Sequence, residues 1–554
     1  MLFNTLSFLF LFFPVVLVIS RILEGKKKIF FLMLLSLIFY SVHNIANLLV
    51  LILSITFNYV SAKKFSKKIY FPILLNLLIL FFFKYASDIF DLSLFRENLT
   101  LPLGISFFTF QQISYLLDAK YKSTQRHNII EYAFYVSFFP QLIAGPIIKF
   151  RDMINQLKNQ RSIRTKIFYH KAIIGFIIFS VGLIKKVVFA DTLAEFVDPI
   201  FLDISAGQDN VSMITAWFAI ICFSFQIYFD FSGYCDMATG LAFMLGFKIP
   251  INFYSPFKSQ NVSQFWARWN ITLTKFFTSI LYNNSAVYIG RNLHWIKHKK
   301  IKFFLTQIIP FLITFSIIGI WHGSGLNFFM FGLTHAIFLS VYYIFKYSKK
   351  YSINKHLSIA ITFICVTISF VFFRCENMDQ VLIMFTKLFF IKNLLMPESL
   401  SFLAESFPFF NYFRFGEVYY WQGTRTLIWI TLSFILCFMC PNINEIFKKY
   451  RVSIENISQN QKASLMPNLK ILLLLFLFIP ITYLQTIPTF YKYLPTSISV
   501  VIFFSLTLTL LFLPMETLRV RINMKICMIS VLLFFISFLK IFSGRENEFI
   551  YFAF

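Results

Sequence analysis

The residue best suited to acid–base chemistry in this sequence is His322, in the run Gly319-Ile320-Trp321-His322-Gly323. It follows a long apolar stretch, and polar groups inside a membrane are costly enough to make each one a functional candidate. An imidazole there could take the proton of an attacking hydroxyl group. His335 follows about 220° further around a helix, so the two histidines do not form a local metal site. A histidine held only by packing is the alternative.

Asn270 is the strongest hydrogen-bonding group of a second stretch, which runs from Ser263 to Lys275 and contains Trp266 and Arg268. At helical spacing this stretch has an apolar row and a row of small and polar side chains. The two rows are Phe265, Trp269, Leu273, Phe276 and Ile280, and Ser263, Ala267, Asn270, Thr274 and Thr278. A small polar row lets a substrate or another helix come close. Asn270 could therefore bind substrate, or it could only bridge two helices.

A third stretch, Phe138–Pro146, contains Pro140, Gln141 and Gly145 within an apolar segment. Proline removes a backbone donor and glycine loosens the chain, so a helix must break here. The freed backbone groups could face a ligand, or the break could be a packing kink.

The fourth stretch, Gln226–Asp236, places Asp230 and Asp236 among aromatic residues. The two carboxylates lie about 240° apart on a helix, so they do not share a face as an acid/base pair would. A loop between two spans, with the carboxylates capping a helix or pairing with Lys or Arg, is the alternative.

The elements that position these residues must be membrane helices. Of the 554 residues, 58% are apolar and 14% charged, and the mean hydropathy is +0.71. These values exclude a soluble enzyme and a disordered chain. The net charge of +27 does not indicate nucleic-acid binding. The basic residues occur in short runs between apolar stretches, which is typical of cytoplasmic loops.

Apolar stretches long enough to span a membrane predict an all-α polytopic protein with about a dozen transmembrane helices. Ile29–Tyr59 has room for a helical hairpin, and lysines at 26–28 and 63–68 place both its flanks in the cytoplasm. The other predicted spans are Leu6–Ser20, Tyr70–Tyr85, Lys171–Leu183, Ser212–Phe229, Gly233–Phe247, Phe303–Ile320, Asn327–Phe345, Leu357–Phe373, Val381–Ile391, Thr426–Met439, Leu469–Leu484, Ser497–Leu513 and Lys525–Phe542. Leu101–Leu117 and Ala133–Ile148 are predicted as re-entrant or broken helices.

In this order, the four stretches resemble the membrane-bound O-acyltransferase family, and its bacterial alginate O-acetylation branch in particular. The matching text is Leu101–Phe107, Phe139–Pro146, Tyr228–Met237, Asn252-Phe253 with Pro256-Phe257, Phe265–Thr272, Trp321-His322-Gly323 with His335, and Phe549–Phe552. The likeness covers residues 1–395 and returns at the end of the sequence. The resemblance implies helices around a central tunnel, which an acyl donor enters from the cytoplasmic side and an acceptor hydroxyl from the other side.

The resemblance also assigns the site. The family's invariant histidine corresponds to His322 and its second active-site position to Asn270. The bacterial polysaccharide branch usually has His at that second position, so this chain departs from its branch there and again at Tyr282–Gly290, where a tyrosine-proline-leucine-glycine-glycine run is usual. Both departures concern the acceptor. Candidate substrate-binding residues are Pro140, Gln141, Gly145, Asp230, Asp236, Trp266, Arg268, Trp321 and His335.

The chemistry expected is attack of a hydroxyl group on a thioester, with His322 as general base. Asn270 would donate to the oxyanion or orient the hydroxyl group. Because no Ser or Cys is evidently activated by His322, although Ser324 is close, direct transfer is favoured over an acyl-enzyme. No bound cofactor or metal is expected, and acetyl-CoA is the expected acyl donor. The expected partners are membrane lipid, an envelope polysaccharide acceptor and a periplasmic acyl-handling protein, in a bacterial cytoplasmic (inner) membrane.

Three alternatives stay open from the sequence. The acyl group could differ from acetyl, or the acceptor could be a lipid or a small molecule. The chain could instead be a transporter or flippase, although it lacks the internal repeat that many transporters carry. It could also be an inactive scaffold. We expect residues 1–395 to form the acyltransferase core, 396–468 a connecting segment with one span, and 469–554 further helices of the same membrane domain.

Overall fold

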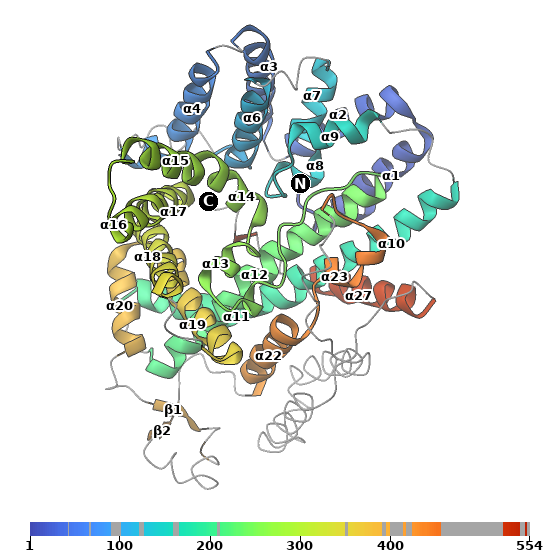
Figure 1. Cartoon of the computed structure of the whole chain (residues 1–554). Helices are drawn as coiled ribbons and strands as arrows, with labels where there is room; N and C mark the ends of the chain where they lie inside the picture. Colours follow the sequence, from blue (N-terminus) through green and yellow to red (C-terminus); the bar gives the residue numbers. More distant parts are fainter. Residues whose placement is uncertain are drawn as a thin grey trace, which may run out of the picture.

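The computed structural model (Figure 1) describes residues 1–42, 44–65, 68–89, 101–120, 127–158, 165–207, 211–348, 353–389, 395–398, 401, 414–416, 424–455, 524–542 and 549–550. Six helical segments in this part are long and apolar enough to cross a membrane: Ile45–Lys64, Ile167–Ser205, Met213–Met244, Lys299–His322, Leu326–Ser348 and Lys355–Arg374. Shorter apolar helices are Phe8–Ile22, Tyr70–Tyr85, Arg425–Met439 and Ile526–Phe542. The chain is thus an all-α polytopic membrane protein, as predicted.

The central element is α12, Met213–Met244, a continuous helix of 32 residues that is buried along most of its length. The prediction of two spans with a loop near residues 229–233 is therefore wrong. Gly233, where the loop was predicted, lies inside the helix and packs against Gly182 of α10, Thr165–Ile184. A Cβ added to Gly182 would come 2.7 Å from the Gly233 carbonyl oxygen. Only small residues allow two membrane helices to approach this closely.

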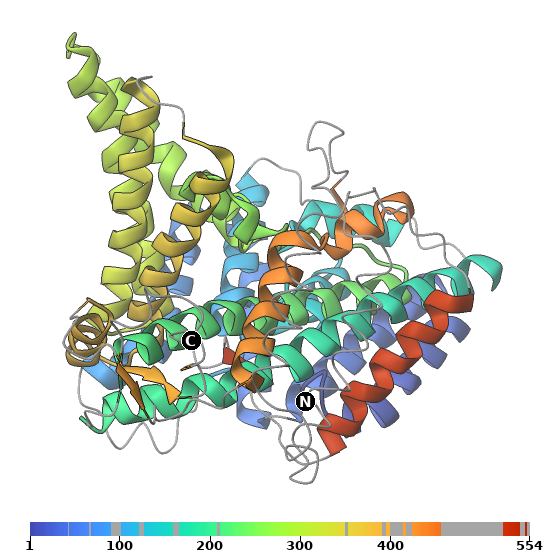
Figure 2. The ribbon, with the colours of Figure 1, turned by 90° about the horizontal axis from the view of Figure 1, so that it is seen from below.

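The helical segment that packs on α12 is longer than the predicted span Lys171–Leu183. After α10 the chain continues as a π-helix, η2, Lys185–Ala190, and then as α11, Asp191–Ser205. Helix α27, Met524–Phe542, lies alongside α10 (Figure 2). Basic and acidic residues of η2 and α12 therefore face one another inside the protein.

The N-terminal part contains the predicted hairpin, formed by α2, Gly25–Ser41, and α3, Ile45–Lys64. Asn44 caps α3 by accepting the Ala46 N–H at 2.7 Å. The neighbouring helices are η1 (Phe8–Phe12), α1 (Phe13–Ile22), α4 (Tyr70–Ile89), α6 (Ile105–Lys120), α7 (Ile129–Ser137), α8 (Phe139–Leu142) and α9 (Phe150–Lys158). Both basic flanks of the hairpin lie at the same end, because its two helices run antiparallel.

Helices α17, Ile309–His322, and α18, Leu326–Ser348, form a second tightly packed pair. A Cβ added to Gly332 would come 2.1 Å from the Phe315 carbonyl oxygen, so the pair can pack this closely only with glycine there. Helix α19, Lys355–Arg374, packs against α18 (Figure 2). The predicted span Val381–Ile391 corresponds to α20, Met378–Phe389, whose 12 residues are too few to span a bilayer alone.

The remaining elements are short. They are η3 (Pro256–Lys258), α13 (Val262–Trp266), α14 (Ile271–Phe277), η4 (Thr278–Tyr282), α15 (Asn283–Asn292), α16 (Lys299–Phe303), η5 (Phe304–Ile308), α22 (Thr424–Phe434), η9 (Ile435–Met439), α23 (Ile443–Ile446) and η10 (Lys448–Tyr450). Two three-residue strands, β1 (Leu395–Pro397) and β2 (Arg414–Gly416), pair in parallel. The predicted spans Leu469–Leu484 and Ser497–Leu513 lie outside the described residues.

Candidate active site

His322 is the last residue of α17, where the helix ends at Gly323. The side chain is buried, with the whole residue 3% exposed. Aromatic rings surround the imidazole, whose centroid lies 4.5 Å from that of Trp321, 5.1 Å from Phe373 and 5.7 Å from Phe331. The close α17–α18 packing therefore fixes an imidazole in an apolar setting, which suits a general base.

Two residues of α4 hold the end of α17. Tyr85 donates from its hydroxyl group to the Ile320 carbonyl oxygen at 2.7 Å. Lys84 donates from Nζ to the Trp321 carbonyl oxygen, and Nζ lies 5.2 Å from the centre of the Trp321 ring. A cation at a helix C-terminus is favourable because the last carbonyl groups carry partial negative charge. The sequence analysis missed both residues, although a lysine inside the apolar run at 70–85 was a signal.

His335 is buried in α18 and has partners on both ring nitrogens. Trp266 donates from Nε1 to Nδ1 of His335 at 3.2 Å, and Ser369 Oγ lies 2.9 Å from Nε2. Because the Ser369 hydroxyl donates to the Val366 carbonyl oxygen at 2.6 Å, its oxygen accepts from Nε2–H. His335 is thus a neutral Nε2–H tautomer that joins α13, α18 and α19. The predicted residues Trp266 and His335 lie together as an internal brace.

Asn270 lies in the turn between two helices and not within one continuous helix. The apolar row and the row of small and polar residues predicted for Ser263–Lys275 are therefore wrong. Helix α13 ends at Trp266, α14 begins at Ile271, and Asn270 between them has φ 42° and ψ 52°. This left-handed conformation is one that Asn adopts more readily than most residues. No glycine or proline marks the break in the sequence.

The Asn270 side chain is buried inside the protein. The residue is 2% exposed, and its Oδ1 has no hydrogen-bond partner in the part of the chain that the structure describes. Asn252 fixes the following turn, because its backbone oxygen accepts from Ile271 N–H at 2.9 Å and its Oδ1 from Thr272 N–H at 3.1 Å. A buried carbonyl oxygen without a partner is an acceptor site for a ligand hydroxyl group.

The predicted break at Phe138–Pro146 is present. Helix α7 ends at Ser137, and α8 is a single turn that contains Pro140 and Gln141. Gln141 holds the break by donating from Nε2 to the Tyr135 carbonyl oxygen at 2.7 Å. The chain then passes Gly145 to Ile147, whose N–H donates to Thr272 Oγ1 at 3.0 Å. The break is thereby joined to the turn that contains Asn270.

A layer of aromatic rings connects Asn270 with His322. Trp269, which precedes Asn270, lies 5.7 Å from Phe370 between ring centroids, and Phe370 lies 6.2 Å from Phe331. Phe331 in turn packs on the His322 ring. Three of the four stretches singled out in the sequence, those with His322, Asn270 and the α7–α8 break, are therefore parts of one connected region.

The two carboxylates of the fourth stretch, Asp230 and Asp236, form ion pairs inside the protein. Lys186 Nζ lies 2.7 Å from Asp230 Oδ1 and 3.0 Å from Asp191 Oδ1. Ile550 donates its N–H to Asp230 Oδ2 at 2.9 Å. Pairing with a basic residue was the alternative expected for the two carboxylates, and it is what the structure shows for both.

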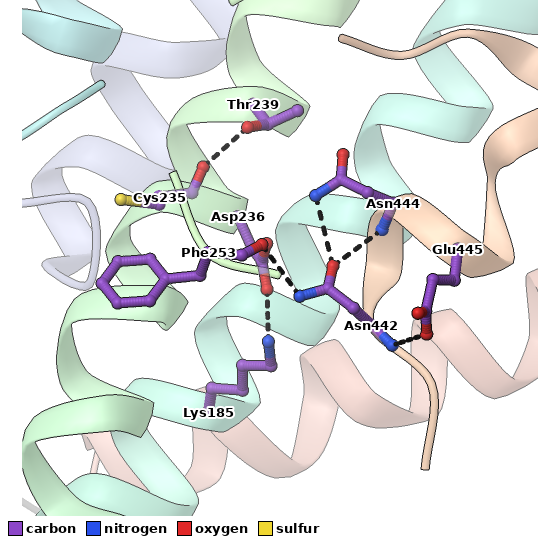
Figure 3. Close-up of polar contacts among 8 residues, drawn as sticks. All are labelled: Lys185, Cys235, Asp236, Thr239, Phe253, Asn442, Asn444 and Glu445. Atoms are coloured by element: carbon purple, nitrogen blue, oxygen red, sulfur yellow. Dashed lines mark hydrogen bonds and ion pairs between the residues drawn. The ribbon is translucent and has the colours of Figure 1, made fainter. Parts of the chain in front are cut away.

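Asp236 pairs with Lys185 Nζ at 2.6 Å, next to the bonds that Asn442 makes to Phe253 and Glu445 (Figure 3). A cavity of about 190 Å³ lies beside this pair. It is lined mainly by apolar side chains of α10, α12, η9, α23 and α27, with Lys185, Tyr228 and Asn442 among the polar residues. Arg268 is half-buried, and its backbone oxygen accepts from Tyr254 N–H at 2.9 Å.

Sequence comparison settles the family. A sequence profile of the membrane-bound O-acyltransferase family matches residues 32–379, more than half of the chain. The chain belongs to the membrane-bound O-acyltransferase family. The match includes His322, Asn270 and the α7–α8 break. The protein is therefore an acyltransferase enzyme that works within a membrane.

Relatives whose activities are named support the same class of enzyme. A peptidoglycan O-acetyltransferase of Helicobacter pylori is 37% identical over 69% of this chain and 78% of its own length. A probable alginate O-acetylase, AlgI, of Pseudomonas aeruginosa is 32% identical over 70% of this chain and 75% of its own. A teichoic acid D-alanyltransferase of Bacillus subtilis is 27% identical over 46% of this chain and 62% of its own. The resemblance to the alginate O-acetylation branch is thus confirmed.

Proposed function

We propose that this membrane-bound O-acyltransferase moves an acetyl group from a cytoplasmic thioester donor, acetyl-CoA, to hydroxyl groups of a cell-envelope polysaccharide. The observation that carries the proposal is the buried His322, which the end of α17 fixes among aromatic rings. In this setting His322 accepts the hydroxyl proton as general base. Relatives named for peptidoglycan and alginate acetylation support a polysaccharide acceptor. These relatives are bacterial, which supports a location in the bacterial inner membrane. The proposal includes a periplasmic acyl-handling protein as partner.

Asn270 orients the acceptor hydroxyl group in this proposal. Its buried atom without a partner among the described residues is the carbonyl oxygen Oδ1, which can accept a hydrogen bond from the hydroxyl group but cannot stabilise an oxyanion. His322 then removes the proton as the oxygen attacks the thioester carbon. The acyl group passes directly to the acceptor, and the thiol leaves.

The first experiment replaces His322 by Ala. Removal of a general base lowers turnover by about 10²–10⁴-fold. Turnover is the rate at which membrane vesicles that contain the protein transfer label from acetyl-CoA to envelope glycan, at matched protein amounts. Mass spectrometry of the glycans identifies the acyl group and the acceptor. Transfer by His322→Ala at the wild-type rate would contradict the proposed mechanism.

The second experiment separates the side chain of Asn270 from its backbone. Asn270→Gly removes the amide but keeps the left-handed conformation without strain, whereas Asn270→Ala adds about 1–2 kcal/mol of backbone strain. If Asn270 orients the acceptor, both variants lose turnover, and only the Ala variant also loses thermal stability. Asn270→His restores the residue usual in the bacterial branch, and we expect partial activity. Full turnover of Asn270→Gly would remove Asn270 from the site.

Transfer of a different acyl group is the second candidate function. It is favoured by the similarity to a teichoic acid D-alanyltransferase. The same mass spectrometry separates the two, because a D-alanyl ester and an acetyl ester differ in mass.

A further inference from the structure

The indole N–H of Trp321 is a buried donor without an acceptor among the described residues. The residue is 7% exposed, and Nε1 has no hydrogen-bond partner in that part of the chain. Two other tryptophans show the ordinary arrangement. Trp217 donates from Nε1 to the Leu388 carbonyl oxygen at 3.1 Å, and Trp266 donates to His335 at 3.2 Å. Buried polar groups are nearly always paired, so an unpaired one calls for an explanation such as a ligand.

The Trp321 ring is also held in place on several sides. Its centroid lies 5.5 Å from that of Phe110 and 6.1 Å from that of Phe107, both on α6. Lys84 of α4 lies over the ring, with Nζ 5.2 Å from its centre. A ring enclosed in this way keeps its N–H in one place before substrate binds. Such fixed donors are the kind that stabilise charge without reorganisation during a reaction.

Trp321 is the residue directly before the proposed base. The centroids of the Trp321 and His322 rings lie 4.5 Å apart. A donor for the acyl oxygen and a base for the attacking hydroxyl group must both lie within reach of one carbonyl group. Asn270 presents the acceptor atom Oδ1, and the Trp321 N–H is a buried donor next to the base that could serve the acyl oxygen.

We propose that Trp321 is a catalytic residue, whose indole N–H donates to the carbonyl oxygen of the acyl thioester and stabilises the oxyanion. The inference rests on the proposed function. The acceptor oxygen forms a bond to the carbonyl carbon, and the π electrons of the carbonyl group move to its oxygen, which Trp321 holds. His322 takes the hydroxyl proton. When the oxyanion collapses, the C–S bond breaks and the departing thiolate takes that proton from His322.

The test compares Trp321→Phe with a control, Trp217→Phe, which also deletes one indole N–H, in this case from a half-buried ring. Loss of one oxyanion donor lowers kcat by about 10²–10³-fold. We expect this fall for Trp321→Phe, with the KM for acetyl-CoA within about threefold of wild type, because the bond strengthens mainly as charge develops. Trp217→Phe should keep its kcat within about threefold of wild type, because a donor outside the site does not meet the developing charge.

A second variant separates the N–H from the shape of the ring. Replacement of Trp321 by 3-benzothienylalanine, introduced by codon suppression, keeps the size of the indole but has sulfur in place of N–H. The inference requires that this variant is as slow as Trp321→Phe. Wild-type kcat for it would overturn the inference and assign Trp321 to packing alone.

The outcomes also distinguish this inference from the proposed function. A fast Trp321→Phe beside an inactive His322→Ala would overturn the role of Trp321 and leave the general base in place. A fast His322→Ala would overturn the proposed function and this inference with it. The rates are measured in membrane vesicles at varied acetyl-CoA concentrations, at matched amounts of folded protein.

Discussion

Variants of the Lys185–Asp236 ion pair can show whether the Asp236 carboxylate stabilises the fold or takes part in the reaction. The sequence left open whether Asp236 binds substrate or pairs with a basic residue. In the structure the pair is 2.6 Å long, with side chains only 15% and 11% exposed. The experiment uses three variants: Lys185→Met, Asp236→Leu and the two together.

The expected free energies follow from burial. Removing one partner leaves the other charge buried and uncompensated, which costs about 3–5 kcal/mol. Replacing both partners by apolar residues of similar size is often neutral or stabilising, by about 1–4 kcal/mol relative to the pair. The cavity beside Lys185 is mainly apolar, so the Met side chain has suitable neighbours there. We therefore expect two unstable single variants and a double variant near the wild type.

The measurements are thermal unfolding in detergent and acyl transfer in membrane vesicles, both at matched protein amounts. If Asp236 is structural, the double variant has wild-type stability and wild-type turnover. A stable double variant without activity would show that the carboxylate takes part in the reaction, and the structural role would then be wrong. Single variants that are as stable as the wild type would contradict the expected energies.

Three further predictions concern packing and topology. Gly145→Ala should lower the free energy of unfolding by about 1–3 kcal/mol, because the new Cβ would lie 2.3 Å from Gln141 Cα. The control Gly290→Ala should be as stable as the wild type, since the nearest atom to its new Cβ lies at 3.8 Å, and thermal unfolding measures the stability of both variants. Tyr85→Phe removes the bond to the end of α17 and should cost about 0.5–1.5 kcal/mol together with some turnover, measured in the same assays. Single cysteines at Lys27 and Lys64, in a chain without its own seven, should resist impermeant thiol reagents in intact cells, and strong labelling would invert the N-terminal topology.

The spans and the site motif could be predicted because hydropathy and residue type act locally. The hairpin at 29–59 and the break at Phe138–Pro146 follow from lysine runs and from proline and glycine, whose effects extend over a few residues. His322 was recognisable as a polar residue after an apolar run. These features need no knowledge of distant neighbours.

The features that the sequence did not show depend on contacts between distant segments. The close approach of α12 to α10 depends on Gly233 and on Gly182 of the other helix, and the turn between α13 and α14 at Asn270 is fixed by hydrogen bonds to Asn252. Tyr85 reaches Ile320 across 235 positions of sequence. Spacing rules cannot anticipate such partners, because they describe one element at a time.

The hydrogen bond from Ile550 to Asp230 has a consequence for how the protein is made. The two residues are 320 positions apart, so at about 5–20 residues per second the ribosome adds Ile550 roughly 15–60 s after Asp230. Lys186 and Asp191 are synthesised before Asp230, so the ion pairs can form as soon as α12 enters the membrane. The contact with Ile550 completes this cluster last. A nascent chain paused before residue 550 would already contain the helices of the site, but Asp230 Oδ2 would lack the hydrogen bond from the Ile550 N–H.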